Sequence, residues 1–332
     1  MADYDLSILI PARGEMFVTH TVEDILKNKR GRTEIIVGLD GYGYTNTAWP
    51  VDGIPDHPDV KVVHVSEARG QRGMTNMLAK LSNAKYLAKS DAHCAFDEGF
   101  DVKLMNAIQG HDDWTVVPIM RNLHAFDWKC MSCGKRTYQG PTPGTKGAKF
   151  SVCEDCGANN FKRKVIWYPK PSPQSTAYCF DPEPHFQYFN SFKKRPEGRG
   201  DITQTPSLQG SFFMLTREKY WELNICDENF GSWGSQGIEV ALKTWLSGGE
   251  VMCVQTTWYA HMFRTQGGDF SFPYPQQQSK VENAKKIARE TFFDGNWDKQ
   301  VYPVSWLIEK FWPVDHWTDD DLRKLKERES QR

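Results

Sequence analysis

Two residues with the chemistry of metal ligands, Asp91 and His93, follow a short segment that leans apolar, residues 85–90. If residues 86–88 form a strand, the i, i+2 spacing directs both side chains to the same side of the chain. A carboxylate oxygen beside an imidazole suits Mn²⁺ or a similar divalent cation, which at a strand end can hold a diphosphate by neutralising its charge. Taken alone, such a pair is more often a turn aspartate beside a surface histidine, so other segments must decide between the two interpretations.

A second set of metal-binding side chains lies further along the chain. Four of the eight cysteines form two Cys-x-x-Cys pairs, Cys130 with Cys133 and Cys153 with Cys156, with 19 residues between the pairs. Each second cysteine precedes a glycine, which suits the tight turn of a zinc knuckle. The pattern predicts a closed four-thiolate Zn²⁺ site that folds a small ribbon and has no open position for substrate. Two chance pairs of reduced thiols are the alternative.

The segments before Asp91 predict the elements that would position it. β-rich runs at residues 6–10, 34–39 and 60–65 accompany one segment, residues 18–27, whose apolar residues recur at helical spacing. A further strand is expected over residues 114–119. The alternation of strand and helix predicts an α/β fold with a mostly parallel sheet.

In such sheets, ligands bind beyond the carboxyl ends of the strands. Pro11, Arg13 and Asp40 follow two of the predicted strands and are candidates for contacts to a nucleotide. A Gly-flanked basic loop with Arg69 and Arg72 leads into the next predicted helix, whose first backbone amides could hold a phosphate or ribose with these arginines. A surface loop with two solvated arginines is the alternative.

The composition describes an ordinary enzyme-like chain. The sequence has 332 residues, of which 39% are hydrophobic and 25% charged, and 12 are Trp, which excludes a disordered or fibrous protein. No apolar run approaches the roughly 18 residues that span a bilayer, and residues 1–5 lack the features of a signal peptide. We therefore expect a cytoplasmic protein that does not bind a membrane.

The charge is unevenly distributed. Residues 128–200 carry a net charge of +8, whereas the rest of the chain carries −9. This basic segment encloses the two cysteine pairs. Its aromatic residues alternate with basic ones, as stacking on an exposed nucleic-acid strand requires, and they are Trp128, Tyr138, Phe150, Phe161, Trp167 and Tyr168. The segment is therefore predicted to bind DNA, with a solvated, merely stabilising insertion as the alternative.

Three blocks together resemble a known family. They are Asp-Ala-His-Cys at 91–94, Phe-Gly-Ser-Trp-Gly-Ser-Gln-Gly-Ile-Glu at 230–239, and Ala-His-Met-Phe-Arg at 260–264. In this order they resemble the catalytic domain of polypeptide N-acetylgalactosaminyltransferases, and the likeness continues through Phe270-Ser-Phe-Pro273. It covers most of residues 5–125 and 208–296. The resemblance implies a GT-A (Rossmann-like) nucleotide-sugar-binding fold. The inserted four-cysteine zinc ribbon, which the cysteine spacing predicts, has no counterpart in that family.

The resemblance also implies a UDP-sugar donor and a divalent cation, usually Mn²⁺, held by Asp91, His93 and His261. Trp233 and Arg264 match positions that close over the donor and contact its diphosphate. Two further donor contacts are implied: Asp40 lies where this fold binds uridine, and Arg69 lies close to the family's nucleotide-binding arginine. Glu239 is expected to orient the start of its helix or the sugar.

The sequence departs from the family at two positions of the expected site. Gln236 stands where the family has Glu, and Lys89 interrupts a strand that is apolar in the family. Inverting enzymes of this fold carry a carboxylate base near the start of the helix after the Trp loop, whereas an amide cannot take a proton at neutral pH. We therefore expect retention of configuration, with the leaving phosphate accepting the proton.

These inferences predict a glycosyltransferase in four parts. Residues 1–127 form the nucleotide-sugar-binding half, 128–200 the basic zinc-ribbon insertion, 201–296 the acceptor and metal half, and 297–332 a C-terminal helical extension. The leading prediction for the acceptor is a hydroxymethylated pyrimidine base in DNA, reached by base flipping or in a single strand. The alternatives are protein Ser or Thr, a cell-surface polysaccharide, or an inactive nucleic-acid-binding scaffold.

Overall fold

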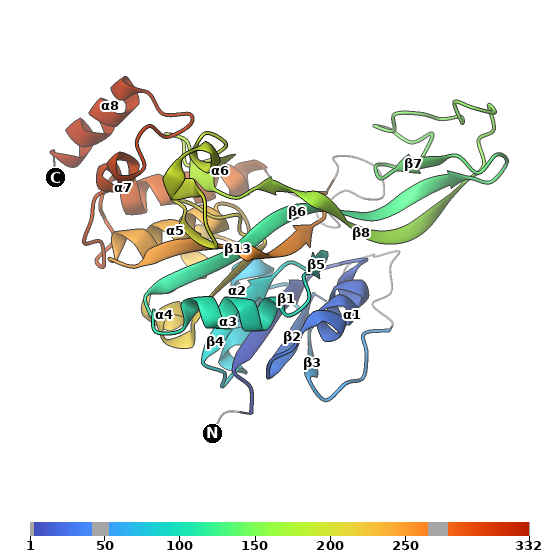
Figure 1. Ribbon diagram of the computed structural model, residues 1–332, viewed down its shortest axis with the longest axis horizontal. Coiled ribbons are helices and arrows are strands. Elements are labelled where there is room, and N and C mark those ends of the chain that lie inside the picture. The colour runs from blue at the N-terminus through green and yellow to red at the C-terminus, as the bar shows by residue number, and fades with distance from the viewer. Residues whose placement is uncertain (1–2, 42–52, 265–277, 332) are drawn as a thin grey trace.

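The computed structural model describes residues 3–41, 53–264 and 278–331 and is built on one large mixed sheet (Figure 1). The strands of the main path lie in the order β11-β13-β6-β12-β4-β1-β2-β3. Their bounds are β1 (Leu6–Ala12), β2 (Thr33–Asp40), β3 (Val60–Val65), β4 (Tyr86–Ser90), β6 (Trp114–Cys130), β11 (Ile202–Gln204), β12 (Phe212–Thr216) and β13 (Glu250–His261). The other strands are the long β8 (Phe161–Ser175) and the short β5 (Cys94–Phe96), β7 (Arg136–Tyr138), β9 (Tyr178–Phe180) and β10 (Phe186–Tyr188).

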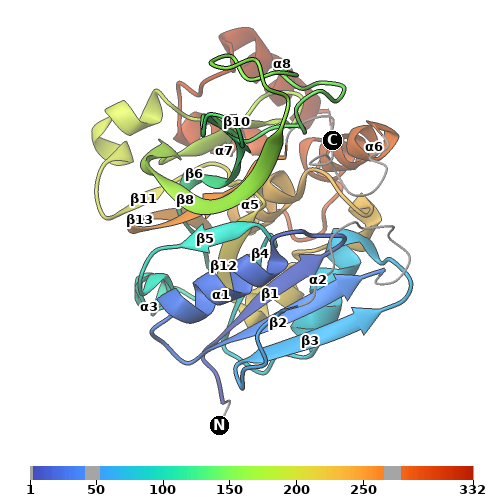
Figure 2. The same cartoon turned by 90° about the vertical axis from the view of Figure 1, so that its right-hand side faces the viewer.

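Helices cover both faces of this sheet (Figure 2). They are α1 (Val18–Asn28), α2 (Gly70–Lys80), α3 (Phe100–Ile108), α4 (Arg217–Glu222), α5 (Gln236–Leu246), α6 (Gln278–Ala288), α7 (Val304–Lys310) and α8 (Asp319–Glu329). Shorter helical turns are η1 (Phe192–Lys194), η2 (Pro196–Gly198), η3 (Glu228–Phe230) and η5 (Arg289–Phe293). Among the described residues, none of these helices has the length and apolar character needed to cross a membrane.

The parallel half of the sheet follows from its apolar strands. β1 pairs in parallel with both β2 and β4, and β2 pairs in parallel with β3. β2 is buried at every position, as expected for a strand with helices on both faces. The helix α2 approaches closely at Gly38, where a Cβ would lie 2.5 Å from the Sδ atom of Met74. The predicted α/β architecture with a mostly parallel core is confirmed.

The basic segment is not a separate body joined by a linker. The strand expected over residues 114–119 extends through Cys130 as β6, and β8 pairs with it in antiparallel orientation along this extension. The two strands form a long arm that leaves the body of the protein and carries β7 and the cysteine pairs at its tip (Figure 1). Near its base the arm contacts α1, where Trp167 donates a hydrogen bond of 3.0 Å to Asp24.

The chain beyond residue 296 forms α7 and α8, which pack beside α5 and η5 (Figure 1). Thr318 caps α8 as its sequence predicts, because its side chain accepts from the backbone of Asp321 while the Asp321 carboxylate accepts from the backbone of Thr318. The segment Phe270 to Pro273, used above for the resemblance, lies outside the described residues.

Candidate active site

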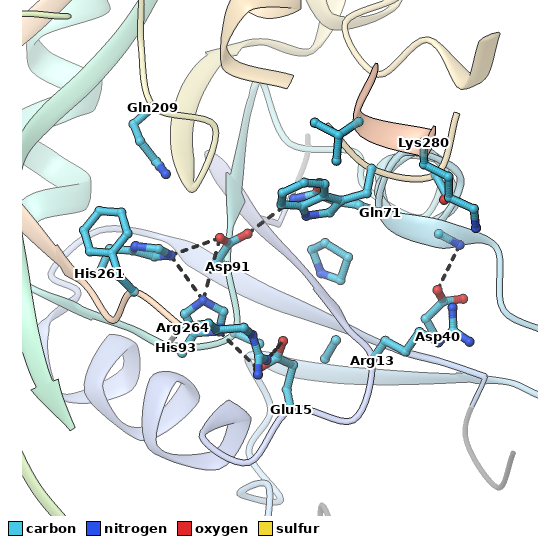
Figure 3. Close-up of a pocket in the computed structure, with 18 residues that line it drawn as sticks. Arg13, Glu15, Asp40, Gln71, Asp91, His93, Gln209, His261, Arg264 and Lys280 are labelled. Carbon is cyan, nitrogen blue, oxygen red and sulfur yellow. Dashed lines mark hydrogen bonds and ion pairs between the residues drawn. The ribbon is translucent and has the colours of Figure 1, made fainter. Parts of the chain in front are cut away.

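The sheet brings the three expected cation ligands together (Figure 3). Asp91 and His93 lie just beyond β4, and His261 ends β13, which reaches them because it pairs with β5. The Nε2 atom of His261 lies 3.1 Å from Nε2 of His93 and 3.2 Å from Oδ2 of Asp91, and the third side of the triangle is 3.9 Å. Neighbouring ligands of an octahedral cation with bonds of about 2.1 Å lie about 3 Å apart, so the triangle fits one face of such a cation.

Glu15 orients one of these ligands from behind. Its Oε2 atom lies 3.1 Å from Nδ1 of His93, and its Oε1 atom is ion-paired with Arg264. Burial raises the pKa of Glu15, but His93 and Arg264 outweigh burial and hold that pKa at about 2. An ionised Glu15 keeps the proton of His93 on Nδ1, which leaves the Nε2 lone pair facing the centre of the triangle.

Lys89 holds the other oxygen of Asp91. Its side chain is buried, ion-paired with Oδ1 of Asp91, and 2.8 Å from the carbonyl oxygen of Gly210. Burial raises the pKa of Asp91, but Lys89 and the two histidines more than offset it and hold that pKa well below its usual range. The carboxylate is therefore ionised, with Oδ1 engaged by the ammonium group and Oδ2 facing the imidazoles.

His261 is ready to bind a cation at neutral pH. Burial lowers its pKa to about 4, so the imidazole is neutral. Its Nδ1 atom is buried without a hydrogen-bond partner among the described residues. The Nε2 atom faces His93 and lies 3.2 Å from Oδ2 of Asp91. In the tautomer with the proton on Nδ1, Nε2 would offer its lone pair to a cation.

A cavity of about 500 Å³ extends from this triangle to Asp40. Asp40 accepts hydrogen bonds from the backbone amides of Arg69 (2.6 Å) and Gly70 (2.9 Å) at the start of α2. Gly70 has a φ of +79°, and a Cβ there would lie 2.5 Å from Cβ of Ser232, so only glycine lets α2 meet the Trp233 loop so closely. Eight of the site residues predicted from the sequence line this cavity: Pro11, Arg13, Asp40, Asp91, His93, Trp233, His261 and Arg264.

Two of the site residues predicted from the sequence, Arg72 and Glu239, lie outside the cavity. Arg72 and Glu239 are both fully buried, and Nε of Arg72 lies 2.8 Å from the Glu239 carboxylate. Arg72 also donates to the carbonyl oxygens of Gly231 (3.1 Å) and Gly234 (2.6 Å), on either side of Trp233. Neither side chain lines the cavity, so their contact to a ligand is indirect: they fix the Trp233 loop on α2 and α5. Arg69 contributes its backbone amide, and its own side chain is exposed.

A second cavity of about 400 Å³ adjoins the first and holds Gln236. The two share the residues Gln71, Asp91, Gln209, Trp233 and Val281. Glu15, Lys89 and Gln209 were not singled out from the sequence as site residues. The only signal for Glu15 is its place just beyond β1, and for Lys89 its charge within an apolar strand.

The four paired cysteines meet at the tip of the arm. The Sγ atoms of Cys130 and Cys156 lie 3.6 Å apart and those of Cys133 and Cys153 3.5 Å apart, and all four lie within 4.8 Å of one another. Tetrahedral Zn²⁺ with Zn–S bonds of about 2.3 Å separates its sulfurs by about 3.8 Å, so the cluster fits this ion. The backbone amide of Cys133 helps lower the pKa of Cys130 to about 6, whereas hydrogen bonds with the neighbouring thiols raise the pKa of Cys133 and of Cys156, so the geometry is what favours a metal here.

Comparisons with known proteins agree with this architecture. Residues 7–158 match the model of glycosyl transferase family 2. The solved structure of GalNAc-T7 with UDP, GalNAc and Mn²⁺ superposes with a TM-score of 0.62 at 16% identity, over 98% of this chain and 54% of that one. The fold is GT-A. The predicted resemblance to the catalytic domain of polypeptide N-acetylgalactosaminyltransferases is thereby confirmed at the level of the fold.

Curated relatives carry the same family name. Polypeptide N-acetylgalactosaminyltransferase 13 of Drosophila melanogaster is 30% identical over 260 residues, which are 76% of this chain and 39% of the relative. The human protein of that name is 22% identical over 232 residues, 69% of this chain and 35% of the relative. The chain thus spans less than two fifths of the length of these relatives.

Proposed function

We propose that this GT-A protein is a metal-dependent glycosyltransferase that uses a UDP-sugar as donor. The observation that carries the proposal is the convergence of Asp91, His93 and His261 at one end of a cavity long enough to reach Asp40. The structural neighbour crystallised with UDP and Mn²⁺ supports both the donor and the cation. The family match and the names of the relatives support the reaction class.

Each residue has a distinct role in this proposal. Asp91, His93 and His261 would hold Mn²⁺, which when bound supplies Lewis-acid stabilisation of the departing diphosphate. Arg13 and Asp40 lie at the other end of the cavity, where they would contact the nucleoside. Trp233, whose loop also lines the cavity, would cover the donor and exclude water.

The reaction is proposed to retain the configuration of the sugar. Within the described residues lining the two cavities, the carboxylates are Glu15, Asp40 and Asp91, and each already has partners. None is free to act as a base. The bond from the anomeric carbon to the acceptor oxygen would form as its bond to the phosphate oxygen breaks, and UDP would leave with the acceptor proton. The anomer of the product, read by NMR, tests this, and an inverted product would refute it.

The acceptor is proposed to be a Ser or Thr hydroxyl of a polypeptide. The names of the relatives state polypeptide acceptors, and none of the reported comparisons supports the hydroxymethylated DNA base expected from the basic insertion. One observation keeps nucleic acid as a second candidate. Lys129 lies directly opposite Lys162 in the arm, so two exposed cations face each other, whereas Arg136, on the other side of Lys129, is ion-paired with Asp127. Like charges directly opposite one another destabilise a sheet, which an anionic partner would relieve.

One experiment separates these possibilities. Purified protein is incubated with Mn²⁺ and a panel of UDP-sugars against Thr- and Pro-rich peptides, hydroxymethylated DNA, unmodified DNA and polysaccharide, and the products are read by mass spectrometry. We expect one UDP-sugar to modify peptide, and Asp91→Asn to abolish the reaction. If neither transfer nor Mn²⁺-dependent hydrolysis of any UDP-sugar occurs, the chain is a scaffold and the proposal fails.

For the arm, we propose a structural Zn²⁺ bound by Cys130, Cys133, Cys153 and Cys156. The near-tetrahedral sulfur cluster supports this ion. Because all four thiolates would be occupied, the site would hold the ribbon together and take no part in sugar transfer.

A further inference from the structure

The second cavity has an end that no part of the donor site explains. Asp40 lines only the first cavity, whereas the turn between β9 and β10 and the side chain of Lys285 on α6 line only the second. Asp91 lies where the two meet. A donor whose nucleoside lies at Asp40 and whose diphosphate lies at Asp91 places its sugar at this junction, so the far end is left for whatever receives the sugar.

His185, on the turn at that far end, is held in one orientation. Its Nδ1 atom lies 3.0 Å from Oδ2 of Asp181 and 3.2 Å from Oδ1. The same carboxylate accepts from the backbone amides of Glu183 and His185, each at 3.0 Å, and from the side chain of Gln187 at 3.1 Å. Asp181 therefore cannot turn away, and it keeps the His185 proton on Nδ1.

The opposite nitrogen of His185 is then an acceptor. The imidazole side chain is 41% exposed and lines the second cavity, so Nε2 offers its lone pair to a donor group there. An imidazole whose Nδ1 atom is fixed by a carboxylate, with Nε2 turned to the ligand, is the arrangement that proteins use to bind and orient a reacting hydroxyl.

Gln236 gives a second, independent sign of a ligand in this cavity. Its side chain is only 6% exposed, and its Nε2 atom contacts Sγ of Cys226 at 3.3 Å. Its Oε1 atom is buried without a hydrogen-bond partner among the described residues. A buried acceptor without a partner is unfavourable, and a hydroxyl of a bound molecule would supply the missing hydrogen bond.

We propose that the second cavity is the acceptor site, where Nε2 of His185 receives a hydrogen bond from the hydroxyl that is to be glycosylated. Gln236 accepts from a hydroxyl of the sugar at the junction. The acceptor is a neutral, hydroxyl-bearing group, which the apolar walls formed by Pro184, Phe186 and Ile238 suit. This inference rests on the proposed function, and the proton still leaves with UDP. His185 positions the hydroxyl for attack.

The test compares transfer to an acceptor with hydrolysis of the donor by water. The variants are His185→Ala and Asp181→Asn, the second of which keeps an oxygen for the backbone amides of the turn. A Thr- and Pro-rich peptide is the acceptor, with glycerol at high concentration as a second one. We expect the ratio of transfer to hydrolysis to fall about tenfold in both variants, since one hydrogen bond to the reacting group is lost. The KM for the acceptor should rise while the KM for the UDP-sugar stays the same.

Calorimetry with UDP and Mn²⁺ shows whether each variant is folded and competent for the donor. His111→Ala, an exposed histidine that stacks on Trp114, serves as the control for loss of an imidazole. An unchanged ratio in both variants, or an equal loss of transfer and hydrolysis, overturns the assignment of His185. Failure of the wild-type protein to bind UDP with Mn²⁺ would instead refute the proposed function, so the two failures can be told apart.

Discussion

The carboxylate of Asp91 is shared between the cation site and the buried ammonium group of Lys89. Glu15 is paired with Arg264, so the four charged side chains around the triangle compensate one another. A divalent cation bound there would keep its full charge, which the diphosphate of the donor is able to neutralise. We therefore expect the cation and the nucleotide to strengthen each other's binding.

Substitution of Lys89 by Met tests this coupling. Without the ammonium charge, Mn²⁺ alone should bind about tenfold more tightly or better, because one nearby repulsion is removed. UDP should then add less to the affinity for Mn²⁺ than it does in the wild-type protein. Calorimetric titration with Mn²⁺, with and without UDP, measures both effects. Lys103→Met, which removes a lysine paired with Asp97, is the control, and equal Mn²⁺ affinities of Lys89→Met and wild type would contradict the prediction.

His261 predicts a pH dependence of stability in metal-free protein. Its folded pKa of about 4 lies below the ordinary value of 6.5, so the unfolded chain binds more protons between these values. The free energy of unfolding should therefore fall as the pH drops from 6.5 to 4, by about 3 kcal/mol at most. Urea unfolding in EDTA at several pH values measures this. His261→Gln should flatten the slope in part only, since the pKa of His124 is also lowered to about 4 by burial; an unchanged slope would refute the assignment.

Site residues could be predicted where the chain carries a local motif. Asp91, His93, His261 and Trp233 were found because they occur in short blocks with a recognisable order. Glu15 was missed as a site residue because its partners, His93 and Arg264, lie far along the chain. The carboxylate partners of Lys89 and His185 are close in sequence, but only the fold shows that these two side chains lie beside the cavities. Arg72 and Glu239 were predicted to contact a ligand, but both side chains are fully buried outside the cavity. The sequence does not reveal how deeply a side chain is buried.

At the scale of elements, the buried pair of Arg72 and Glu239 joins α2 to α5. Arg72→Met leaves Glu239 with Lys243 but without its guanidinium partner, and frees the carbonyl groups beside Trp233. We expect a loss of about 3–5 kcal/mol in the free energy of unfolding, because a buried pair is broken on one side. Chemical denaturation measures it. Because Glu239→Leu also removes a partner of the buried Lys243, the double variant Arg72→Met, Glu239→Leu should lose less than the sum of the two single losses. Additive losses would argue against a pairwise effect.

The ribbon at the tip of the arm should depend on zinc. Cys133→Ala removes one of four ligands, so we expect the zinc content to fall from about one ion per chain to none. Faster hydrogen exchange in residues 130–160 should accompany the loss, because the ribbon has little core of its own. Binding of UDP with Mn²⁺ should not change. Ser132→Ala, beside the ligand, is the control, and full zinc content in Cys133→Ala would refute the site.

The elements of the parallel half could be predicted because strand and helix periodicities are unambiguous there. The length of β6 could not, since residues 120–130 mix polar and apolar side chains. Their extended conformation depends on pairing with β8, whose partner residues lie 31 to 55 positions further along the chain. Only the folded protein reveals that the insertion continues a strand of the central sheet.

At the scale of the whole molecule, the +8 segment and the −9 remainder predict how salt should affect activity. Transfer to a neutral peptide should change little between 50 and 200 mM salt, whereas a DNA complex with 6–10 phosphate contacts should weaken by about 10³–10⁵-fold. Transfer rates at several salt concentrations measure this. The triple variant Lys129→Gln, Arg136→Gln, Lys162→Gln should weaken only a reaction on nucleic acid. A large effect on peptide transfer would contradict a polypeptide acceptor that does not contact the arm.

The continuity of β6 has a consequence for the spacing of products. Beyond its last pair with β13, which joins Asn122 to His261, β6 continues for about 25 Å to Cys130 without an intervening loop. The ribbon and the cation ligands are therefore held at a fixed separation by one continuous strand. A polymer gripped at the tip would be glycosylated at a constant distance from the gripped segment, so mapped modification sites on a long acceptor should show a fixed interval.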